Sequence, residues 1–393
     1  MMPKLQSLSI SGFKSIRELK SPSRLLSIST IGPRPSGFPL SDLNVLIGAN
    51  GAGKSNFISL FRLLNEMAGQ RLQLFVQQQG GPDALLHFGR KRTERLRGAF
   101  HFDRGSYEFD LVPAQDNRLV FVHECYGNKD SAPDTEWDPI PSGSGYPESL
   151  LWAPFPLKGD HAEPQFREAK GSFSSDLGKS SGNWRFWHFC DTGETARIKQ
   201  RHPGNDNLIL KPDAANLGAY LRRLHREHGA EYGRIVSTIR LVAPFFGDFV
   251  HRPGEPEYIE LEWTSKDDPD TPFKAHVLSD GTLRFMCLAT LLLQPIELLP
   301  ATILIDEPEL GLHPYAIAVL ADIFRQVAEE RQLIVSTQSV ELVNELEPED
   351  VIVVDQEDGA STFRRLEREE LSGWLEEYAL GELWRRNIIG GSP

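Results

Sequence analysis

The sequence predicts an α/β fold, because two apolar runs have the pattern of buried strands. Each run is followed by residues that can bind a phosphate or a metal ion. The first run, residues 44–47, leads into residues 48–55, which read GANGAGKS and match the P-loop pattern G-x-x-x-x-G-K-S. The second run, residues 301–305, ends in Asp306 and Glu307. Open α/β sheets place their ligands at the carboxyl ends of such strands. We therefore expect a site for a nucleoside triphosphate at these strand ends.

The spacing of residues within the first motif follows from phosphate chemistry. Gly48, Gly51 and Gly53 let the backbone wrap closely, so that successive N–H groups and the positive end of the next helix converge on an anion. Lys54 adds a positive charge at the β- and γ-phosphates, and the Ser55 hydroxyl is placed to ligate Mg²⁺. The motif opens a helix with apolar side chains at the spacing of one buried face: Phe57, Leu60, Phe61 and Leu64.

The second motif has the pattern of a Walker B strand. Asp306 is expected to hold Mg²⁺, directly or through water, and Glu307 to polarise the water that attacks the γ-phosphate. The alternative is an ordinary strand followed by an acidic helix cap. The presence of a P-loop in the same chain favours the Walker B interpretation.

Between these motifs, residues 278–282 read LSDGT and precede a strongly apolar helix that extends to Leu293. Ser279 and Gly281 at the start of this helix would present a hydroxyl, free N–H groups and the positive dipole end to an anion. The alternative is that Ser279 only caps a buried helix. The position of the segment between the P-loop and the second strand favours the anion-binding interpretation.

Taken together, the motifs resemble those of the ABC-type ATPases and, more narrowly, of the RecF/SMC-like AAA-family ATPases of bacteria. The resemblance extends from the N-terminal region to the C-terminal region of the chain. It rests on SGFKS (11–15), NVLIGANGAGKSN (44–56), LSDGTLR (278–284), IDEPELGLHP (305–314), STQS (336–339), LGELW (380–384) and IGG (389–391).

This resemblance implies hydrolysis of ATP with Mg²⁺ by an ATP-dependent homodimer. Ser279 and Gly281 would contact the γ-phosphate held by the P-loop of a second subunit, and residues 309–314 resemble the D-loop that crosses such an interface. Gln338 occupies the switch position where transporter-type relatives carry His. Because a Gln takes up no proton near neutral pH, it suggests slow, gated hydrolysis.

The same resemblance extends the set of nucleotide-binding residues beyond the P-loop glycines. Lys14 and Ser15 match positions that lie near the nucleotide base in relatives, and Asn50 and Asn56 belong to the loop segment itself. The complete expected set comprises nucleotide-binding Lys14, Ser15, Gly48, Asn50, Gly51, Gly53, Lys54, Ser55, Asn56, Ser279 and Gly281, catalytic Glu307 and Gln338, and the Mg²⁺ ligands Ser55 and Asp306.

We expect an ABC-type lobe that is interrupted by an inserted antiparallel-β and helical region. Residues 1–75 would form the first part of the lobe, 76–270 the inserted region, and 271–393 the second part with the signature, Walker B and switch segments. Residues 21–41 read as a loop insertion, and the Pro-, Gly- and Ser-rich residues 127–182 as a long surface insertion or a partly disordered segment.

Individual elements follow from their periodicities. Alternating runs predict strands at 107–111 and 119–122, and one-sided apolar spacing predicts helices between 213 and 249. In the last third, the patterns predict a helix at 315–329 started by Pro314, strands at 333–337 and 351–355, and a closing helix near 367–384. A heptad repeat of several turns is missing, so the long coiled-coil arm of SMC proteins is not expected.

Composition limits the classes of function. The 393 residues are 40% apolar and carry a net charge of −13, which argues against a protein whose whole surface grips nucleic acid. The cysteines, Cys125, Cys190 and Cys287, have no C-x-x-C spacing, which fits a reducing compartment and offers no zinc site. Metal-ligand spacing is also missing from three histidines: His225, His228 and His251. A signal peptide and a long apolar run are missing too, so we expect a cytoplasmic protein without a membrane partner.

Two basic clusters make DNA a candidate partner. One contains Arg90, Lys91 and Arg92 with Arg95 and Arg97 close behind. The other contains Arg222, Arg223 and Arg226. Each cluster is either a local DNA-contacting patch or, as charge runs usually are, a solvated face.

The expected function is ATP-dependent action in DNA repair, at double-strand breaks or in recombination, or in defence against phage. Any effector activity would come from a separate protein. Two alternatives belong to other classes. One is a non-hydrolysing nucleotide switch or scaffold, and the other is the ATP-binding subunit of a transporter. The transporter is disfavoured by the large insertion between Lys54 and Ser279 and by Gln338.

Overall fold

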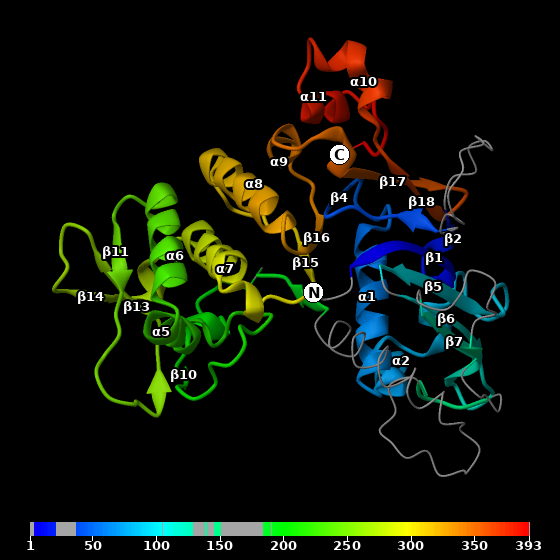
Figure 1. Ribbon diagram of the computed structural model, residues 1–393, viewed down its shortest axis with the longest axis horizontal. Helices are drawn as coiled ribbons and strands as arrows, with labels where there is room; N and C mark the ends of the chain where they lie inside the picture. The colour runs from blue at the N-terminus through cyan, green and yellow to red at the C-terminus, as the bar shows by residue number, and fades with distance from the viewer. Residues whose placement is uncertain are drawn as a thin grey trace. The chain divides into compact units, whose positions relative to one another are not determined.

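The computed structural model describes residues 4–20, 37–103, 105–128, 138–139, 145–150, 184–189 and 191–392. Most of two predicted loop segments, 21–41 and 127–182, and also Cys190, lie outside these residues. The chain divides into two compact units, drawn in Figure 1. The first unit comprises Met1–Trp184 with Ile352–Arg365, and the second comprises Arg185–Val351 with Leu366–Pro393.

The first unit contains an antiparallel sheet. Among the described residues its seven strands follow the order β2-β1-β5-β6-β7-β8, with β3 paired to β1 (Figure 1). The strands predicted at 107–111 and 119–122 are confirmed and lie within β6 and β7. The end of the predicted loop insertion at 21–41 is instead a short strand, β3. The bounds are β1 (Leu5–Phe13), β2 (Ile16–Leu19), β3 (Phe38–Pro39), β5 (Leu96–Phe102), β6 (Gly105–Pro113), β7 (Leu119–Asn128) and β8 (Asp138–Pro139).

Three further strands of the first unit are paired in the order β18-β17-β4, and the chain runs from β4 into the P-loop. Every residue of β4 is buried, which fits an apolar run in a sheet covered on both faces. Strand β17 confirms the strand predicted at 351–355, whereas β18 was not predicted. The bounds are β4 (Leu43–Ile47), α1 (Lys54–Ala68), α2 (Leu72–Gln78), α3 (Pro82–Leu85), β17 (Val351–Glu357) and β18 (Ala360–Arg365).

The second unit is built from a series of helices and a short parallel sheet. Helices α5, α6, α7 and α8 pack successively against one another, and α9 lies between α8 and α11 (Figure 1). Strand β15 pairs in parallel with both β16 and β9. The bounds are β9 (Arg185–Trp187), α5 (Leu217–Glu227), α6 (Gly229–Val242), α7 (Asp280–Leu293), β15 (Thr302–Asp306), α8 (Pro314–Ala328), β16 (Gln332–Ser336), α9 (Val340–Asn344), α10 (Arg368–Leu375) and α11 (Leu380–Arg385).

Most predicted elements of this unit are confirmed. Helix α8 begins at Pro314 as its sequence indicated, and β16 matches the strand predicted at 333–337. The helical prediction for 213–249 was wrong at its end, because the last four residues form a strand that pairs with β13. Aromatic contacts explain this strand, since Phe246 packs on Trp263 across the pair at 6.0 Å between ring centroids. The small strands are β10 (His202–Pro203), β11 (Phe246–Phe249), β12 (Tyr258–Ile259), β13 (Glu262–Ser265) and β14 (Pro272–Lys274).

The closing helix predicted near 367–384 is in fact two helices, α10 and α11. The backbone N–H groups of Glu377 and Tyr378 both bond to the carbonyl of Trp374, which tightens and ends the first helix. The second helix docks on α9 through Gly381, whose N–H donates to Asn344 Oδ1 at 2.8 Å. A Cβ at Gly381 would lie 2.3 Å from the carbonyl oxygen of Val340. The glycine therefore permits the close contact between α11 and α9.

Candidate functional site

The P-loop follows the buried strand β4 and opens helix α1. Gly53 is the N-cap residue of α1, and within the described part of the chain no side chain caps its first N–H groups. A helix start of this kind leaves backbone donors available to an anion. Lys54 is 6% exposed, and its Nζ donates to the carbonyl oxygens of Gly48 at 2.6 Å and Ala49 at 3.1 Å. The ammonium group thus lies along the loop, while Asn50, Gly51 and Ser55 are exposed.

Two P-loop glycines are required by close contacts within the unit. A Cβ at Gly48 would lie 2.2 Å from the carbonyl oxygen of Val354 on β17. A Cβ at Gly53, whose φ is 121°, would lie 2.1 Å from Ser361 Oγ on β18. Gly51 has φ 82°, but a Cβ there would have no neighbour within 4 Å. Gly51 is therefore required by its backbone conformation alone.

The N-terminal candidates lie beside the P-loop helix. Ser15 Oγ accepts from Asn56 Nδ2 at 2.7 Å and lies 2.6 Å from Ser361 Oγ. Ser361 Oγ also contacts the loop directly by donating to the carbonyl oxygen of Ala52 at 2.5 Å. The structure thus brings Ser15 and Asn56 together with the loop and adds Ser361, which was not among the predicted site residues.

Lys14 points to a different set of neighbours. Its Nζ donates to Ser59 Oγ at 2.8 Å and to Gln79 Oε1 at 3.1 Å, and its φ of 49° is unusual for a residue other than glycine. Burial, followed by the nearby Arg62, lowers the pKa of Lys14. Its backbone is fixed by His87, whose Nδ1 lies 2.7 Å from the carbonyl oxygen of Lys14. The lysine is therefore held firmly at the edge of the P-loop region.

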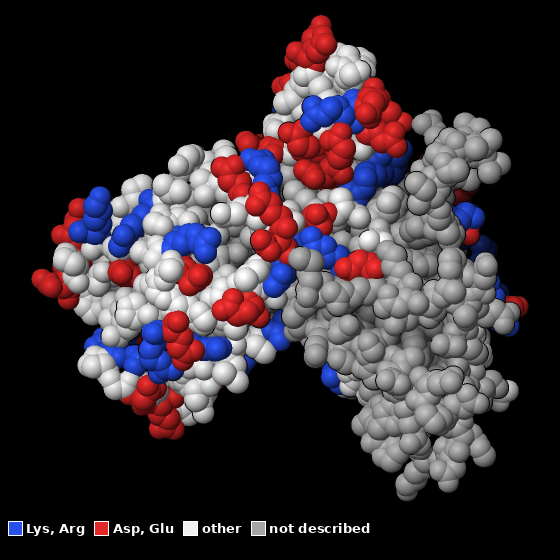
Figure 2. Space-filling model, in the orientation of Figure 1, with Lys and Arg blue, Asp and Glu red and all other residues white. Residues whose placement is uncertain are grey.

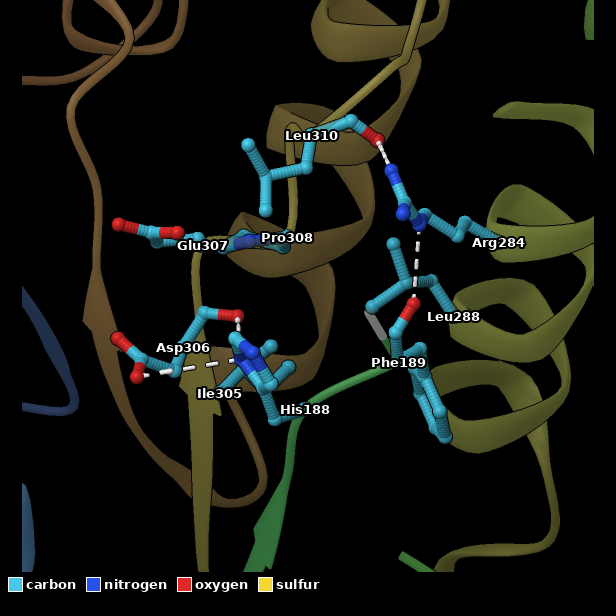
Figure 3. A pocket seen from close by; sticks show the side chains of 9 residues that line it. All are labelled: His188, Phe189, Arg284, Leu288, Ile305, Asp306, Glu307, Pro308 and Leu310. Atoms are coloured by element: carbon cyan, nitrogen blue, oxygen red, sulfur yellow. Dashed lines mark hydrogen bonds and ion pairs between the residues drawn. The ribbon is translucent and has the colours of Figure 1, made fainter. Parts of the chain in front are cut away.

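In the second unit, Asp306 lies at the carboxyl end of β15, where the sequence predicted it. Its Oδ1 accepts a hydrogen bond from Ser336 Oγ at the end of the neighbouring strand β16. His188 approaches from the other side, with its Nδ1 3.2 Å from the carbonyl oxygen and 3.9 Å from Oδ2 of Asp306 (Figure 3). The carboxylate is thus oriented by Ser336, while His188, which directly follows β9, bonds to the backbone carbonyl of Asp306.

Glu307 and Gln338 are adjacent. Gln338 Nε2 donates to Glu307 Oε1, and the N–H of Glu307 donates to the carbonyl of Ser336 at 2.9 Å. Glu307 has φ 46°, a left-handed conformation that is unfavourable for a residue other than glycine because of its Cβ. Strained residues of this kind concentrate at functional sites. The catalytic role of this carboxylate stays a prediction.

A third carboxylate, Glu309, is buried beside this pair. Its Oε1 accepts from Thr337 Oγ1 at 2.6 Å and from the N–H of Gln338 at 2.9 Å. Burial raises the pKa of Glu309. Glu309 thereby positions the backbone of Gln338. The sequence signal for Glu309 was a carboxylate between two apolar residues directly after the Walker B motif.

The signature segment is organised by contacts within its own chain. Ser279 caps α7, because its Oγ accepts from the N–H of Thr282 at 3.2 Å. A Cβ at Gly281 would lie 2.1 Å from the carbonyl oxygen of Gly311, so this glycine permits the approach of the segment that follows Walker B. The contact of Ser279 and Gly281 with a second subunit's nucleotide stays a prediction.

Arg284, one helical turn into α7, ties two loops to the Walker B region. Its Nε donates to the carbonyl of Phe189 at 3.0 Å and its Nη1 to the carbonyl of Leu310 at 2.8 Å (Figure 3). Arg284 and His188 both line a small pocket that also includes Asp306 and Glu307. No role was predicted for either residue. Strand β9, which carries the chain to His188, is only three residues long and has no readable period.

The basic clusters are largely paired with carboxylates. Arg90 Nε lies 3.0 Å from Asp83, and Arg97 Nε lies 3.1 Å from Asp110. Arg223 and Arg226 both contact Glu227, at 2.8 and 2.7 Å. On the face drawn in Figure 2, basic and acidic side chains intermix over the second unit, and acidic ones gather over α10. This pairing is typical of a solvated face.

A family model described as "AAA domain, putative AbiEii toxin, Type IV TA system" matches residues 43–121 and 163–344. No curated protein matches the sequence. The part of the chain that the structure describes contains no helix of the length and apolarity needed to cross a membrane.

The solved structures that are similar to this chain include two SMC head domains. The crystal structure of the SmcHead bound to the C-winged helix domain of ScpA has a TM-score of 0.58 and 16% identity, and covers 94% of this chain and 100% of that chain. The Smc head domain with an extended coiled coil, bound to the C-terminal domain of ScpA derived from Pyrococcus furiosus, has a TM-score of 0.56 and 15% identity, and covers 96% and 99%. At these identities the likeness is one of fold.

These matches confirm the predicted fold class, an α/β P-loop ATPase fold of the ABC type, as in the SMC heads. The family model spans more than half of the chain, including the P-loop, the signature segment and the Walker B strand. The chain therefore belongs to the AAA-domain family described as "AAA domain, putative AbiEii toxin, Type IV TA system".

Proposed function

We propose that this protein binds ATP with Mg²⁺ and hydrolyses it. The observation that carries the proposal is the P-loop, in which close-packed glycines, an uncapped helix start and Lys54 follow one another in eight consecutive positions. Backbone donors and one buried cation are the groups that recognise a polyphosphate. Family membership supports the same activity.

The side chains have distinct roles in this proposal. Lys54 would bind the β- and γ-phosphates, and Ser55 and Asp306 offer the hard oxygen ligands that Mg²⁺ prefers. When bound, Mg²⁺ supplies charge neutralisation at the phosphates. Glu307 would accept a hydrogen bond from the attacking water and polarise it, and Gln338, which donates to Glu307, would hold that carboxylate in position. Ser336 would orient Asp306 in the same way.

Replacement of Lys54 by Ala tests nucleotide binding. A hydrogen bond to a charged group contributes about 1.5–3 kcal/mol, so ATP affinity should fall by roughly 10- to 100-fold. Lys20→Ala is the matched control, since Lys20 is exposed and contacts only the carboxylate of Glu18 among the described side chains, at 3.0 Å. Isothermal titration with ATP and Mg²⁺ measures both variants. Equal affinity in the two variants would contradict the P-loop assignment.

We further propose that two copies of the chain close around ATP and that the dimer acts in defence against phage or in DNA repair. The family description names a toxin of a toxin–antitoxin system, which supports the defence role more than the repair role. The structural neighbours are SMC heads bound to ScpA domains, which supports a separate protein partner for this chain. Ser279 and Gly281 would face the partner copy's nucleotide.

The DNA branch of this proposal has a salt-dependence test. If DNA is bound through the cluster at Arg90, Lys91 and Arg92, binding should require ATP and weaken steeply as salt rises, because each neutralised phosphate adds to the slope. Replacing all three residues by Ala should lower that slope, while replacing Arg222, Arg223 and Arg226 tests the second cluster. Fluorescence anisotropy with a duplex and a single strand measures both. Binding that ignores salt would assign both clusters to a solvated face.

Two other functions stay distinguishable. A non-hydrolysing switch or scaffold for an effector would bind ATP with normal affinity and show no phosphate release above that of Glu307→Gln. A transporter subunit would co-purify with a membrane protein. A phosphate-release assay separates the switch from the proposed ATPase, and mass spectrometry of proteins that co-purify with the Glu307→Gln variant in ATP identifies a membrane partner if the chain is a transporter subunit.

A further inference from the structure

A β-bulge in the first unit sets the direction of three side chains on β7. Leu111 pairs with Phe121 and Asp110 with His123, so Val122 and His123 together oppose one residue of β6. A bulge of this kind reverses the alternation of faces from that point along the strand. Glu124 therefore joins the buried face, opposite Phe109, while His123 and Cys125 lie on the other face.

The register then brings three potential metal ligands together on that second face. Glu108 pairs directly with Cys125 across the two strands, and His123 lies two residues before Cys125. Cys125 Sγ is 3.3 Å from His123 Nε2 and 4.0 Å from Glu108 Oε2. All three ligand atoms lie within 4.8 Å of one another. Among the described residues this is the one group of three or more His, Cys, Asp and Glu side chains with such spacing.

We propose that Glu108, His123 and Cys125 form a binding site for one Zn²⁺ ion. Zinc bonds of about 2.0–2.3 Å in a tetrahedral arrangement place ligand atoms roughly 3.3–3.8 Å apart, which is close to the spacing already present. A thiolate, an imidazole and a carboxylate together select zinc over Mg²⁺ or Ca²⁺, which take oxygen ligands only. Three protein ligands leave the fourth position of the ion for water or another molecule.

Exposure of the three side chains fits such an open site. Cys125 is 3% exposed, Glu108 is partly buried and His123 is exposed. An ion bound here would thus be attached to the buried side of the site by Cys125. Solvent would reach the ion from the side of His123. Burial and nearby carboxylates raise the pKa of the Cys125 thiol to about 12. A coordinated ion reverses this preference, because a thiol that ligates zinc is deprotonated.

The neighbouring carboxylates, Asp110 and Glu124, leave the three ligands available. Asp110, which pairs with His123 in the register, is neutralised by Arg97 at 3.1 Å and Arg95 at 3.5 Å. Glu124 faces the core and accepts hydrogen bonds from Tyr107 at 2.6 Å and from the N–H of Leu150 at 2.9 Å. Each of these carboxylates has its own partners, so neither competes for the ion.

The experiment uses the full chain without nucleotide, first treated with a chelator and then titrated with Zn²⁺ or Co²⁺. We expect one Zn²⁺ bound per chain by elemental analysis. With Co²⁺ we expect the visible bands of a tetrahedral ion and a near-ultraviolet thiolate charge-transfer band. The charge-transfer band reports a cysteine ligand, so weak metal binding by Ser55 or Asp306 cannot produce it. Bound Zn²⁺ and the Co²⁺ absorption bands report this site without an assay of ATP hydrolysis.

Single substitutions decide whether the three residues form the site. Cys125→Ser should abolish the charge-transfer band, and His123→Ala should weaken Zn²⁺ binding at least tenfold. His123 is exposed, so this variant keeps the fold even if Cys125→Ser does not, and circular dichroism checks both. His101→Ala is the matched control, because His101 lies on the same face of β5 outside the cluster. A charge-transfer band that persists in Cys125→Ser, or equal Zn²⁺ affinity in the His123 and His101 variants, would overturn the proposal.

Discussion

The P-loop region and the Walker B region are built in opposite ways. The P-loop acts through its backbone: its glycines permit close packing, and its one charged side chain lies along the loop's own carbonyls. The Walker B region acts through side chains, with Asp306 oriented by Ser336 and His188, and Glu307 held by Gln338. Backbone donors need only the correct φ and ψ angles, whereas each carboxylate needs a side-chain partner from another segment of the chain.

This contrast predicts different sensitivities to mutation. Substitutions that change backbone conformation should damage the P-loop region most, through folding and binding. Substitutions that keep the shape but change the chemistry should damage the Walker B region most, through the rate of hydrolysis. Four predictions, ordered by the size of the expected effect, test this difference.

The largest effect is expected for Glu307→Gln. The substitution keeps shape and hydrogen bonding but removes the charge that polarises water, so hydrolysis should fall by roughly 10²-fold or more while ATP still binds. Phosphate release and ATP titration measure the two properties. Since ATP then persists, light scattering should show an ATP-dependent dimer. Adding Ser279→Arg should abolish that dimer by placing a bulky side chain at the predicted interface. A variant that stays monomeric in ATP, or a double variant that dimerises equally well, contradicts the predicted role of the signature segment.

The second prediction concerns Gly48→Ala. Its Cβ would lie 2.2 Å from the carbonyl oxygen of Val354 in a buried strand, and forced overpacking costs about 2 kcal/mol. Urea unfolding should therefore show a loss of this size. Gly51→Ala is the control, because its Cβ meets nothing within 4 Å and only the left-handed φ of 82° opposes it. Equal loss in both variants would show that backbone conformation, and not packing on β17, requires Gly48.

A smaller effect is expected for Gln338→Ala. Removing the donor to Glu307 leaves the carboxylate in place but less well oriented, so hydrolysis should fall about tenfold, less than in Glu307→Gln. ATP affinity should stay unchanged, which a titration measures. Gln338→Glu is informative as a second variant, because it replaces the donor with a like charge beside Glu307 and should be more damaging than Ala. If Gln338→Ala hydrolyses ATP at the original rate, Gln338 only packs against Glu307.

The smallest effect is a pH dependence at Glu309. Because burial raises the pKa of Glu309 in the folded protein, folding favours the protonated form. Its contribution to stability is complete below the unfolded value near 4.5 and is lost as pH rises through the raised folded pKa. Glu309→Gln cannot ionise, so its free energy of unfolding should decline less over that interval. Parallel curves of unfolding free energy against pH for both proteins would refute this prediction.

The P-loop and Walker B strands could be predicted from sequence because each is a contiguous signal. Five consecutive buried residues form β4, and glycines follow at positions where φ is positive: Gly48, Gly51 and Gly53. Helix α8 was equally readable, since Pro314 sets its start and one apolar face runs along its length. Local patterns of this kind are dictated by neighbours along the chain.

Strand β18 had a local signal that the sequence interpretation overlooked. Asp358 and Gly359, with φ values of 50° and 75°, form the Asp-Gly turn that is typical of a two-residue hairpin. Their flanking residues pair antiparallel from Glu357 and Ala360 outward. The hairpin was predictable in principle, and it places Ser361 against the P-loop.

Other features depended on contacts between distant parts of the chain. Helix α11 docks on Asn344 through the N–H of Gly381, and the partners of Arg284 are carbonyls at Phe189 and Leu310. No local pattern encodes such contacts, because a carbonyl acceptor can belong to any residue type.

The sequence by itself determined that this chain has a P-loop and a Walker B strand, since consecutive residues carry those motifs. The same motifs carry the resemblance to AAA-family ATPases, which the family model confirms. Only the tertiary structure decided that Glu108, His123 and Cys125 share one face, because their meeting depends on strand register and one bulge. Register is set by the packing of a whole sheet face. Because the three residues lie on two strands, they have no fixed sequence spacing that would identify them as a motif.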